Sequence, residues 1–336
     1  MSVSDQASSD PMRVATDRFI ADAARAADGA RARLGGVLND LFRSPESRLS
    51  DRDHAVMTRM LAGLIDEIER IMLPQQAMPI AWAKLAHSRV MRDNELAAML
   101  LRRSDEHQLA HALRAFFPQS RPGVAGEMDG LAHHDDGAIA ELASALLIAE
   151  SRRLDRFGDP LLPMAELPAD LLFRMAWWIA AALRDELDDP ERDSLLAQAV
   201  EVVVAAHEAQ ESAGKLAQAL VARLAPDREA GGRLAAGLIR EGWLTAGVAV
   251  LSALSGTALP HLWSMMGDRD ASRLTLVLRA TDMERAVALG LVADLLVARG
   301  VAGVEGDKRL AAAVGAFDAL SARQARALIR SWKASA

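Results

Sequence analysis

Apolar and polar residues follow a helical spacing along most of the chain, and the clearest example covers residues 51–72. Apolar residues three and four positions apart lie on one face of an α-helix, so this stretch is predicted to bury a broad stripe. Ser50 is a favourable N-cap, and the negative charges of Asp51 and Asp53 suit the first turn. Pro74 ends the helix because its ring clashes with the preceding turn. The predicted core-facing residues are Met57, Met60, Leu61, Leu64, Ile65, Ile68 and Met72.

Similar patterns predict helices through most of the remaining chain. Residues 1–12 are the exception, because they are rich in Ser and Asp and show no periodicity, which predicts disorder. Two capping-box patterns, Thr281 with Glu284 and Ser321 with Gln324, mark helix starts. The connections are short, and short connections make neighbouring helices antiparallel. The further predicted helices cover residues 13–43, 79–89, 93–103, 105–116, 136–153, 168–187, 190–209, 213–224, 227–240, 243–254, 257–266, 270–279, 282–299, 307–317 and 321–333.

The composition favours the same fold class. Ala and Leu, the strongest helix formers, are abundant, and aromatic residues make up only 4% of the chain. We therefore predict an all-α protein whose helices form an α–α superhelix, a HEAT-like helical repeat array. Gly158, Pro160 and Pro163 predict a boundary between an N-terminal helical region, residues 13–160, and a C-terminal helical-repeat region, residues 161–336.

One apolar stretch has the length of a membrane span. Residues 243–267 contain no Asp, Glu, Lys or Arg. However, Ser255, Gly256 and Thr257 in its middle form a turn-and-cap signal. We predict two short buried helices here, and no membrane contact.

Charge and cysteine content exclude several classes of function. The chain has no cysteine, which removes disulfides, thiolate metal sites and thiol nucleophiles. Its formal net charge is −7, whereas duplex-binding proteins usually carry an excess of positive charge. We predict no nucleic-acid partner on this ground. The N-terminal residues lack the basic and apolar regions of a secretory signal, so we predict a cytoplasmic protein.

No catalytic motif is present in the sequence. The nucleotide-binding P-loop, the nucleophile elbow, and the His-Glu-x-x-His and Glu-x-x-His metal motifs are all absent. Gly300, Gly303 and Gly306 precede a lysine, but their spacing and the missing strand indicate an interhelical turn. We therefore assign no catalytic residue, predict no cofactor and expect a protein that is not an enzyme.

The histidines are the best candidates for a metal site. His107 and His111 lie four residues apart on a predicted helix, so both project from one face, which is a metal-ligand spacing. His133 and His134 follow in a loop and could supply two further ligands. The alternative is a polar loop that leads into an N-cap at Asp136, with no metal bound.

Two other features are candidates for a protein interface. Trp177 and Trp178 are adjacent, so one side chain could be exposed as an interface anchor, although both could also be buried between helices. A nearby acidic cluster could attract a basic partner, or could simply be solvated helix ends. The pairs Arg102–Arg103 and Arg152–Arg153 are interpreted as solvated helix ends. The acidic residues are Asp185, Glu186, Asp188 and Asp189.

Several segments are similar to those of an uncharacterised bacterial family. Residues 49–57, continued by the apolar positions up to Glu69, resemble the opening helix of that family. Residues 167–183 resemble its second shared helix, and residues 230–298 fit its pattern of short apolar helices. The family is a bacterial domain of unknown function, and the resemblance implies an all-helical, HEAT-like fold. It implies no activity, because the shared positions are caps and core residues.

The sequence favours a non-enzymatic helical-repeat scaffold or adaptor that binds a protein partner in bacterial signalling or regulation. Paired helices in such folds form extended surfaces suited to partner recognition. The oligomeric state is left open, and a homo-oligomer is compatible with the sequence. The alternative is a metal-dependent binding module or enzyme that uses His107, His111, His133 and His134.

Overall fold

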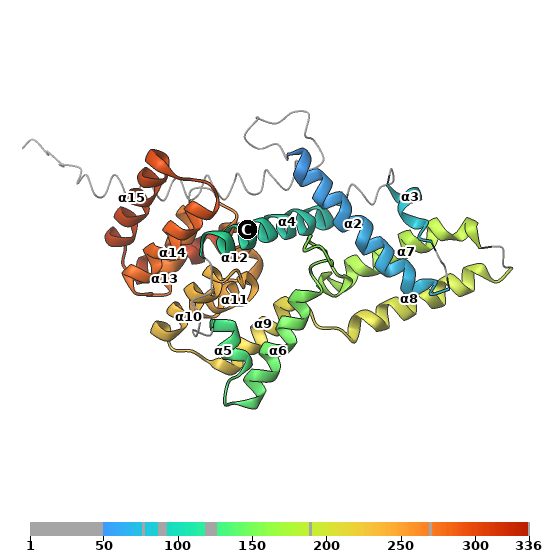
Figure 1. Ribbon diagram of the computed structural model, residues 1–336, viewed down its shortest axis with the longest axis horizontal. Helices are drawn as coiled ribbons and strands as arrows, with labels where there is room; N and C mark the ends of the chain where they lie inside the picture. Colours follow the sequence, from blue (N-terminus) through green and yellow to red (C-terminus); the bar gives the residue numbers. More distant parts are fainter. Residues whose placement is uncertain are drawn as a thin grey trace, which may run out of the picture. The chain divides into compact units, whose positions relative to one another are not determined.

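The computed structural model describes residues 50–75, 78–86, 93–117, 126–187, 190–268 and 271–334. In these ranges the secondary structure is helical, without a β-strand, and Leu154 and Pro160 form an isolated antiparallel bridge (Figure 1). The all-α prediction is therefore confirmed. The disorder predicted for residues 1–12 and the helix predicted over residues 13–43 lie outside the described residues. The superhelical, HEAT-like arrangement stays a prediction.

The chain forms two compact units, each built from separate stretches of sequence. Unit 1 contains the described residues of Leu109–Gly130 and Val221–Ala336, and unit 2 those of Ala32–Gln108 and Leu131–Leu220. The predicted boundary at residues 158–163 lies inside unit 2, because the residues that follow it belong to the unit 2 core.

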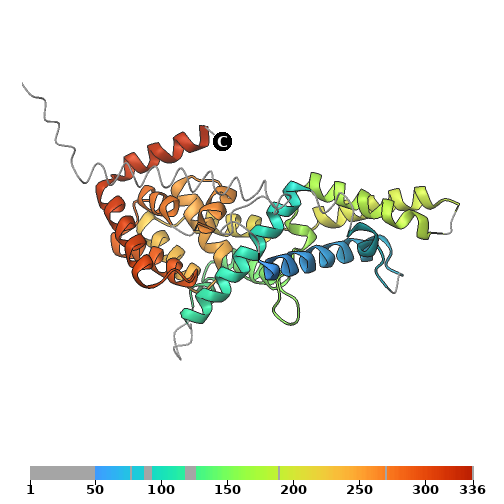
Figure 2. The ribbon, with the colours of Figure 1, turned by 90° about the horizontal axis from the view of Figure 1, so that it is seen from above.

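α2, α3, the first part of α4, α7 and α8 of unit 2 share one hydrophobic core. α7 and α8 pack against each other and against α2, as Figures 1 and 2 show for these yellow-green and blue helices. All seven residues predicted for the apolar stripe of α2 are buried. The elements are α2 (Asp51–Met72), α3 (Ala81–Leu85), the first part of α4 (Asn94–Phe116), α6 (Gly137–Ser151), the 3₁₀ helix η4 (Met164–Glu166), α7 (Ala169–Leu183), η5 (Arg184–Glu186), α8 (Arg192–Glu208) and most of α9 (Ala213–Leu224).

Side-chain caps position α2 and its neighbour α3. Ser50 Oγ accepts a hydrogen bond from Asp53 N at 3.1 Å, and Asp53 Oδ2 accepts one from Ser50 N at 3.1 Å, which completes a capping box. Near the other end of α2, the buried Glu69 carboxylate accepts from the N–H groups of Ile80 and Ala81, both at 2.9 Å. Glu69 therefore satisfies backbone donors at the start of α3, a role that the sequence pattern of α2 did not predict.

The two helices predicted over residues 93–103 and 105–116 are one continuous helix, α4. Ser104, the residue between the two predicted helices, is buried in the interior of α4. No Gly or Pro interrupts the segment, and a serine alone does not end a helix whose neighbouring residues continue the pattern. The interpretation of Arg103 and Arg153 as solvated helix ends is wrong too, because both residues are only 5% exposed.

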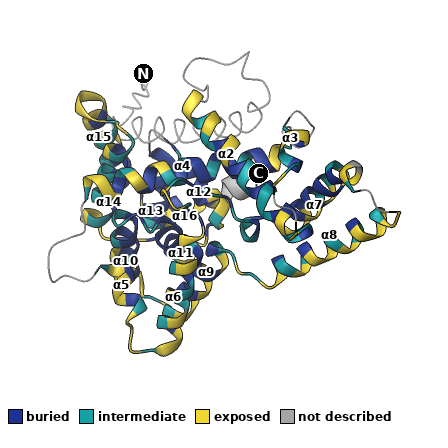
Figure 3. Cartoon of the chain, turned by 45° about the vertical axis from the view of Figure 1, so that its right-hand side comes forward, coloured by how far each residue is buried: buried dark blue, intermediate teal, exposed yellow. Residues whose placement is uncertain are grey.

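Unit 1 contains the predicted pair of short buried helices. Its elements are the end of α4, most of α5 (Glu127–Ala132), the end of α9, α10 (Arg228–Arg240), α11 (Leu244–Ser255), α12 (Leu259–Met266), α13 (Ser272–Ala280), α14 (Arg285–Ala298), α15 (Gly303–Ala319) and α16 (Ala322–Ala334). Gly256 ends α11 with a left-handed φ of 63°, as the turn signal predicted. Figure 3 shows mainly buried residues along α11.

In the part of the chain that the structure describes, no single helix is long and apolar enough to cross a membrane. α11 and α12 reach the required length and composition only as a pair, and they are bent by 117° at the break between them.

α10 and α11 approach each other closely at Gly247. A Cβ atom there would lie 2.5 Å from Ile239 Cγ1 and 3.1 Å from the Ala235 carbonyl oxygen. Only glycine leaves room for this packing, so the position is set by the contact between the two helices.

Candidate functional site

An exposed aromatic pair lies on α7, the helix that carries both candidate tryptophans. Phe173 and Trp177 are 50% and 43% exposed, and one helical turn separates them. Their rings meet edge to face, with centroids 6.2 Å apart and an interplanar angle of 75°. Trp178 is half-buried and packs against the unit 2 core. The alternative in which both tryptophans are buried is therefore wrong for Trp177. We call Phe173 and Trp177 the α7 aromatic pair.

The charges beside this pair are not balanced. Arg174, which lies between the two aromatic residues in sequence, contacts Glu95 at 2.8 Å, Asp170 at 3.0 Å and Asp93 at 3.5 Å. These carboxylates, led by Glu95, raise the pKa of Arg174 above its ordinary value. Among the residues that the structure describes, Arg174 and its three carboxylate partners together carry a formal charge of −2.

The predicted acidic cluster is only partly described. Glu186 forms an ion pair with Lys84 at 2.7 Å. Asp188 and Asp189 lie outside the described residues, as does the side chain of Asp185. Of the four predicted acidic side chains, the structure thus describes that of Glu186, and its charge is paired with Lys84 of the same chain.

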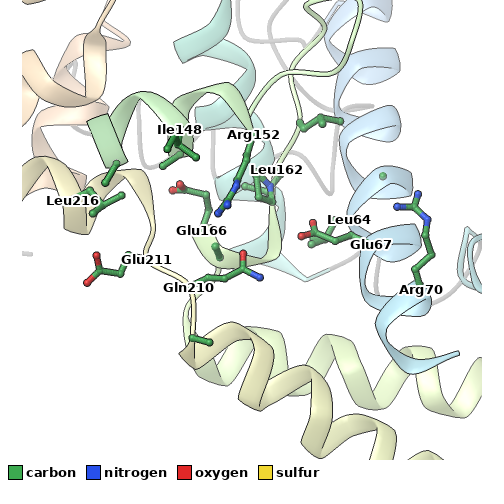
Figure 4. A pocket seen from close by; sticks show the side chains of 17 residues that line it. Leu64, Glu67, Arg70, Ile148, Arg152, Leu162, Glu166, Gln210, Glu211 and Leu216 are labelled. Carbon is green, nitrogen blue, oxygen red and sulfur yellow. The ribbon is translucent and has the colours of Figure 1, made fainter. Parts of the chain in front are cut away.

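A cavity of about 820 Å³ lies elsewhere in unit 2 (Figure 4). α2, α6, the segment around η4, and the connection between α8 and α9 supply its walls. Such a volume is in the range of small-molecule sites, which are mostly apolar with a few polar groups. The apolar lining includes Leu64, Ile148, Leu162 and Leu216, and the polar lining consists of Glu67, Arg70, Arg152, Glu166, Gln210 and Glu211.

Two of the carboxylates in the lining are held by backbone groups. Glu67 accepts from Met164 N at 3.0 Å, and Glu166 accepts from Ala213 N at 2.9 Å. Burial raises the pKa of Glu67 above its ordinary value, against the opposing effects of the Met164 N–H and of a nearby positive charge on Arg70. Both carboxylates therefore fix the backbone that forms the cavity.

The guanidiniums of the two arginines in the lining, unlike these carboxylates, are not held by hydrogen bonds to the backbone that the structure describes. Arg70 projects from α2, and Arg152 is the C-cap of α6. Both residues are exposed, and neither guanidinium has a hydrogen-bond or ion-pair partner among the residues that the structure describes. Both act electrostatically on Glu67, which lies between them in Figure 4. The cavity therefore contains cationic donors whose hydrogen bonds are unused.

A buried ionic cluster lies next to the cavity residue Glu166. Arg153 Nη2 contacts Glu106 Oε2 at 2.5 Å and Arg153 Nη1 contacts Glu150 Oε1 at 3.0 Å, while Arg103 lies 3.5 Å from Glu106. Burial raises the pKa of Glu106, but Arg153 and Arg103 outweigh it and leave the pKa below its ordinary value. Glu166 adds negative charge near both arginines. The cluster joins α4 to α6 at this side of the cavity.

The structure does not bring the four candidate histidines together. His107 and His111 lie on α4, whereas His133 and His134 precede α6. His134 Nδ1 accepts from Asp136 N at 3.0 Å, and Asp136 caps α6 by accepting from Ala138 N at 2.9 Å. This geometry is that of the polar loop leading into an N-cap. Within the described ranges, no group of three or more His, Cys, Asp or Glu residues could hold a metal ion.

The sequence did not reveal the cavity residues as a site. Arg152 was interpreted as a solvated helix end, and Glu67, Arg70 and Glu166 showed no motif. The sequence contained one local indication of the buried ionic cluster: Arg103 and Glu106 are three residues apart, as are Glu150 and Arg153, and this spacing favours ion pairs on a helix. The contacts that bring these pairs together join residues far apart in the chain.

The chain was also compared with known proteins. A bacterial family described as "Uncharacterised protein conserved in bacteria (DUF2336)" matches residues 80–330. The match includes the α7 aromatic pair and begins after α2. No curated protein and no solved structure matches the chain.

Proposed function

The chain belongs to the uncharacterised bacterial family DUF2336, and we propose that it is a non-enzymatic helical adaptor that binds a protein partner through the α7 aromatic pair. The adaptor acts in the bacterial cytoplasm, and its C-terminal helices stack as HEAT-like repeats. These last two parts of the proposal rest on the sequence patterns alone.

The observation that carries the proposal is the exposure of two aromatic rings in mutual contact. Single exposed apolar residues are common on protein surfaces and need no explanation. Phe173 and Trp177 instead form one edge-to-face unit on the outer side of α7, while the opposite side of the helix packs in the core. Tryptophan is enriched among the few residues that dominate binding energy at protein interfaces.

The charges around the pair indicate the chemistry of the partner. The formal charge of −2 left by Arg174 and its carboxylates favours a segment that carries Lys or Arg next to an apolar anchor. The apolar side chain of that segment would cover the rings, and its basic residue would lie over Asp170 or Glu95.

The test is a co-purification with matched variants. The tagged chain is isolated from its native host, and its retained proteins are compared with those of Trp177→Ala and Phe157→Ala. Phe157 is a suitable control because it is 75% exposed in the same unit, in the turn between α6 and η4. We expect a stoichiometric protein that Trp177→Ala loses and Phe157→Ala retains.

The affinity of each variant for the purified partner then measures how much binding free energy Trp177 contributes. Loss of a central interface tryptophan costs about 2 kcal/mol or more, so Trp177→Ala should weaken binding by at least about thirtyfold. Thermal melts establish that both variants are folded. An unchanged set of retained proteins in Trp177→Ala would contradict the proposal. Cross-linking the complex identifies the partner segment that contacts α7, and an acidic segment there would contradict the proposal as well.

A further inference from the structure

The cavity of unit 2 combines an apolar wall with unused positive charge. Leu64 and Leu162 are buried in its lining, and Ile148 is 55% exposed there. Figure 4 shows Arg152 next to Leu162, with Glu67 lying between Arg152 and Arg70. A ligand in this cavity would therefore meet aliphatic surface and guanidinium groups together.

The charged groups of the lining differ in whether they already have hydrogen-bond partners within the protein. Glu67 and Glu166 already accept backbone N–H groups at 3.0 and 2.9 Å. Arg70 and Arg152 have no such partner in the described part of the chain. Glu211 is exposed and lies apart from the arginines, near Leu216 in Figure 4. Arg70 and Arg152 are thus the cationic donors available beside the aliphatic wall, and arginine donors suit carboxylate and phosphate oxygens.

We propose that this cavity binds a small amphipathic anion, whose carboxylate or phosphate headgroup is held by Arg70 and Arg152 and whose aliphatic body lies against Leu64, Ile148 and Leu162. The ligand is a single-chain molecule, since the volume of about 820 Å³ suits small ligands. The site involves neither Phe173 nor Trp177, so it is independent of the proposed protein interface.

The experiment measures binding to the full chain by titration calorimetry at pH 8, with probes that separate charge from apolar character. Decanoate and decyl phosphate carry the anion and the chain, decyltrimethylammonium carries the chain with the opposite charge, and inorganic phosphate carries the anion alone. All are used below their micelle-forming concentrations. We expect both anionic amphiphiles to bind at least tenfold more tightly than the cationic one and than inorganic phosphate.

Variants then locate the site. Arg70→Gln and Arg152→Gln should each weaken decanoate binding about tenfold, because each removes a charge-assisted hydrogen bond. Arg52→Gln is the matched control, since Arg52 is an exposed arginine on the same helix as Arg70 but outside the cavity. Ile148→Ser should weaken decanoate binding, because it removes apolar surface from the lining while leaving the headgroup contacts in place.

Three outcomes would overturn the proposal. The first is the absence of binding by both anionic amphiphiles. The second is equal binding of decanoate and decyltrimethylammonium, which would show that charge plays no part. The third is equal weakening by the Arg52 and Arg70 variants, which would place the anion elsewhere. Retention of the protein partner by the Arg70 and Arg152 variants would separate this result from the adaptor proposal.

Discussion

Replacement of Glu106 by Gln should strongly destabilise unit 2. The Glu106 carboxylate lies 2.5 Å from Arg153 and 3.5 Å from Arg103; the side chain of Glu106 is 4% exposed and those of the two arginines are 6% exposed. Glutamine keeps the shape but removes the charge, so two buried guanidiniums lose their main counterion. Breaking a buried ion pair from one side costs about 3–5 kcal/mol, because the remaining charge stays desolvated and uncompensated.

The assay is urea denaturation at pH 7, followed by tryptophan fluorescence. Trp82 and Trp178 pack against the unit 2 core and report its unfolding. The control is Glu229→Gln, which removes one partner of the exposed Arg233–Glu229 ion pair and should change stability by no more than the experimental error. A loss below about 1 kcal/mol for Glu106→Gln would refute the reasoning, since it would mean that Glu150, water or relaxation compensates the two arginines.

The pH dependence gives a second check on the same prediction. The folded-state pKa of Glu106 lies below its ordinary value of 4.5. Its charge therefore stabilises the folded state fully above pH 4.5, and this contribution is lost as the pH falls through the folded-state pKa. The difference in stability between the parent chain and Glu106→Gln should accordingly be constant near neutrality and shrink in acid.

Three further substitutions test the fold. Glu69→Ala should cost about 1–3 kcal/mol in urea denaturation, because two backbone donors at the start of α3 lose their acceptor; an unchanged midpoint would contradict this. Gly247→Ala should cost about 1–3 kcal/mol, since its Cβ would lie 2.5 Å from Ile239 Cγ1, whereas Gly137→Ala has open space and should not lower the melting temperature. Asp136→Ala should cost about 1 kcal/mol by removing the N-cap of α6, and rescue by Asp136→Ser in a thermal melt would distinguish capping from other roles.

The sequence predicted those parts of the fold that depend on local pattern. The seven apolar positions of α2 are buried, and Ser50 and Asp53 form its cap, because helical spacing and capping involve residues within a few turns of each other. The end of α11 at Gly256 was predictable for the same reason. The split of residues 93–116 into two helices was wrong, because Ser104 has the side chain of a cap but lacks a change in periodicity beside it.

The candidate sites depend on contacts that local pattern does not contain. Arg153 looked like a solvated helix end, but its partner Glu106 lies 47 positions away in the chain. The cavity takes Arg70 from α2 and Arg152 from the end of α6, and no spacing rule connects them. Trp177 was a candidate because adjacent tryptophans point in different directions on a helix, yet which of them is exposed depends on how α7 packs against α2 and α8.

The interleaved order of the two units has a consequence for synthesis of the chain on the ribosome. The end of α4 belongs to unit 1, but every other described part of unit 1, apart from residues 126–130, begins at Val221 or later. Unit 2 in turn requires the chain up to Leu220. The second half of α4 is therefore translated long before α10 to α16 exist, while the rest of the same helix already has unit 2 residues to pack against. We therefore expect unit 2 to complete its core before α10 to α16 are synthesised, with the α4 helix already formed at that stage.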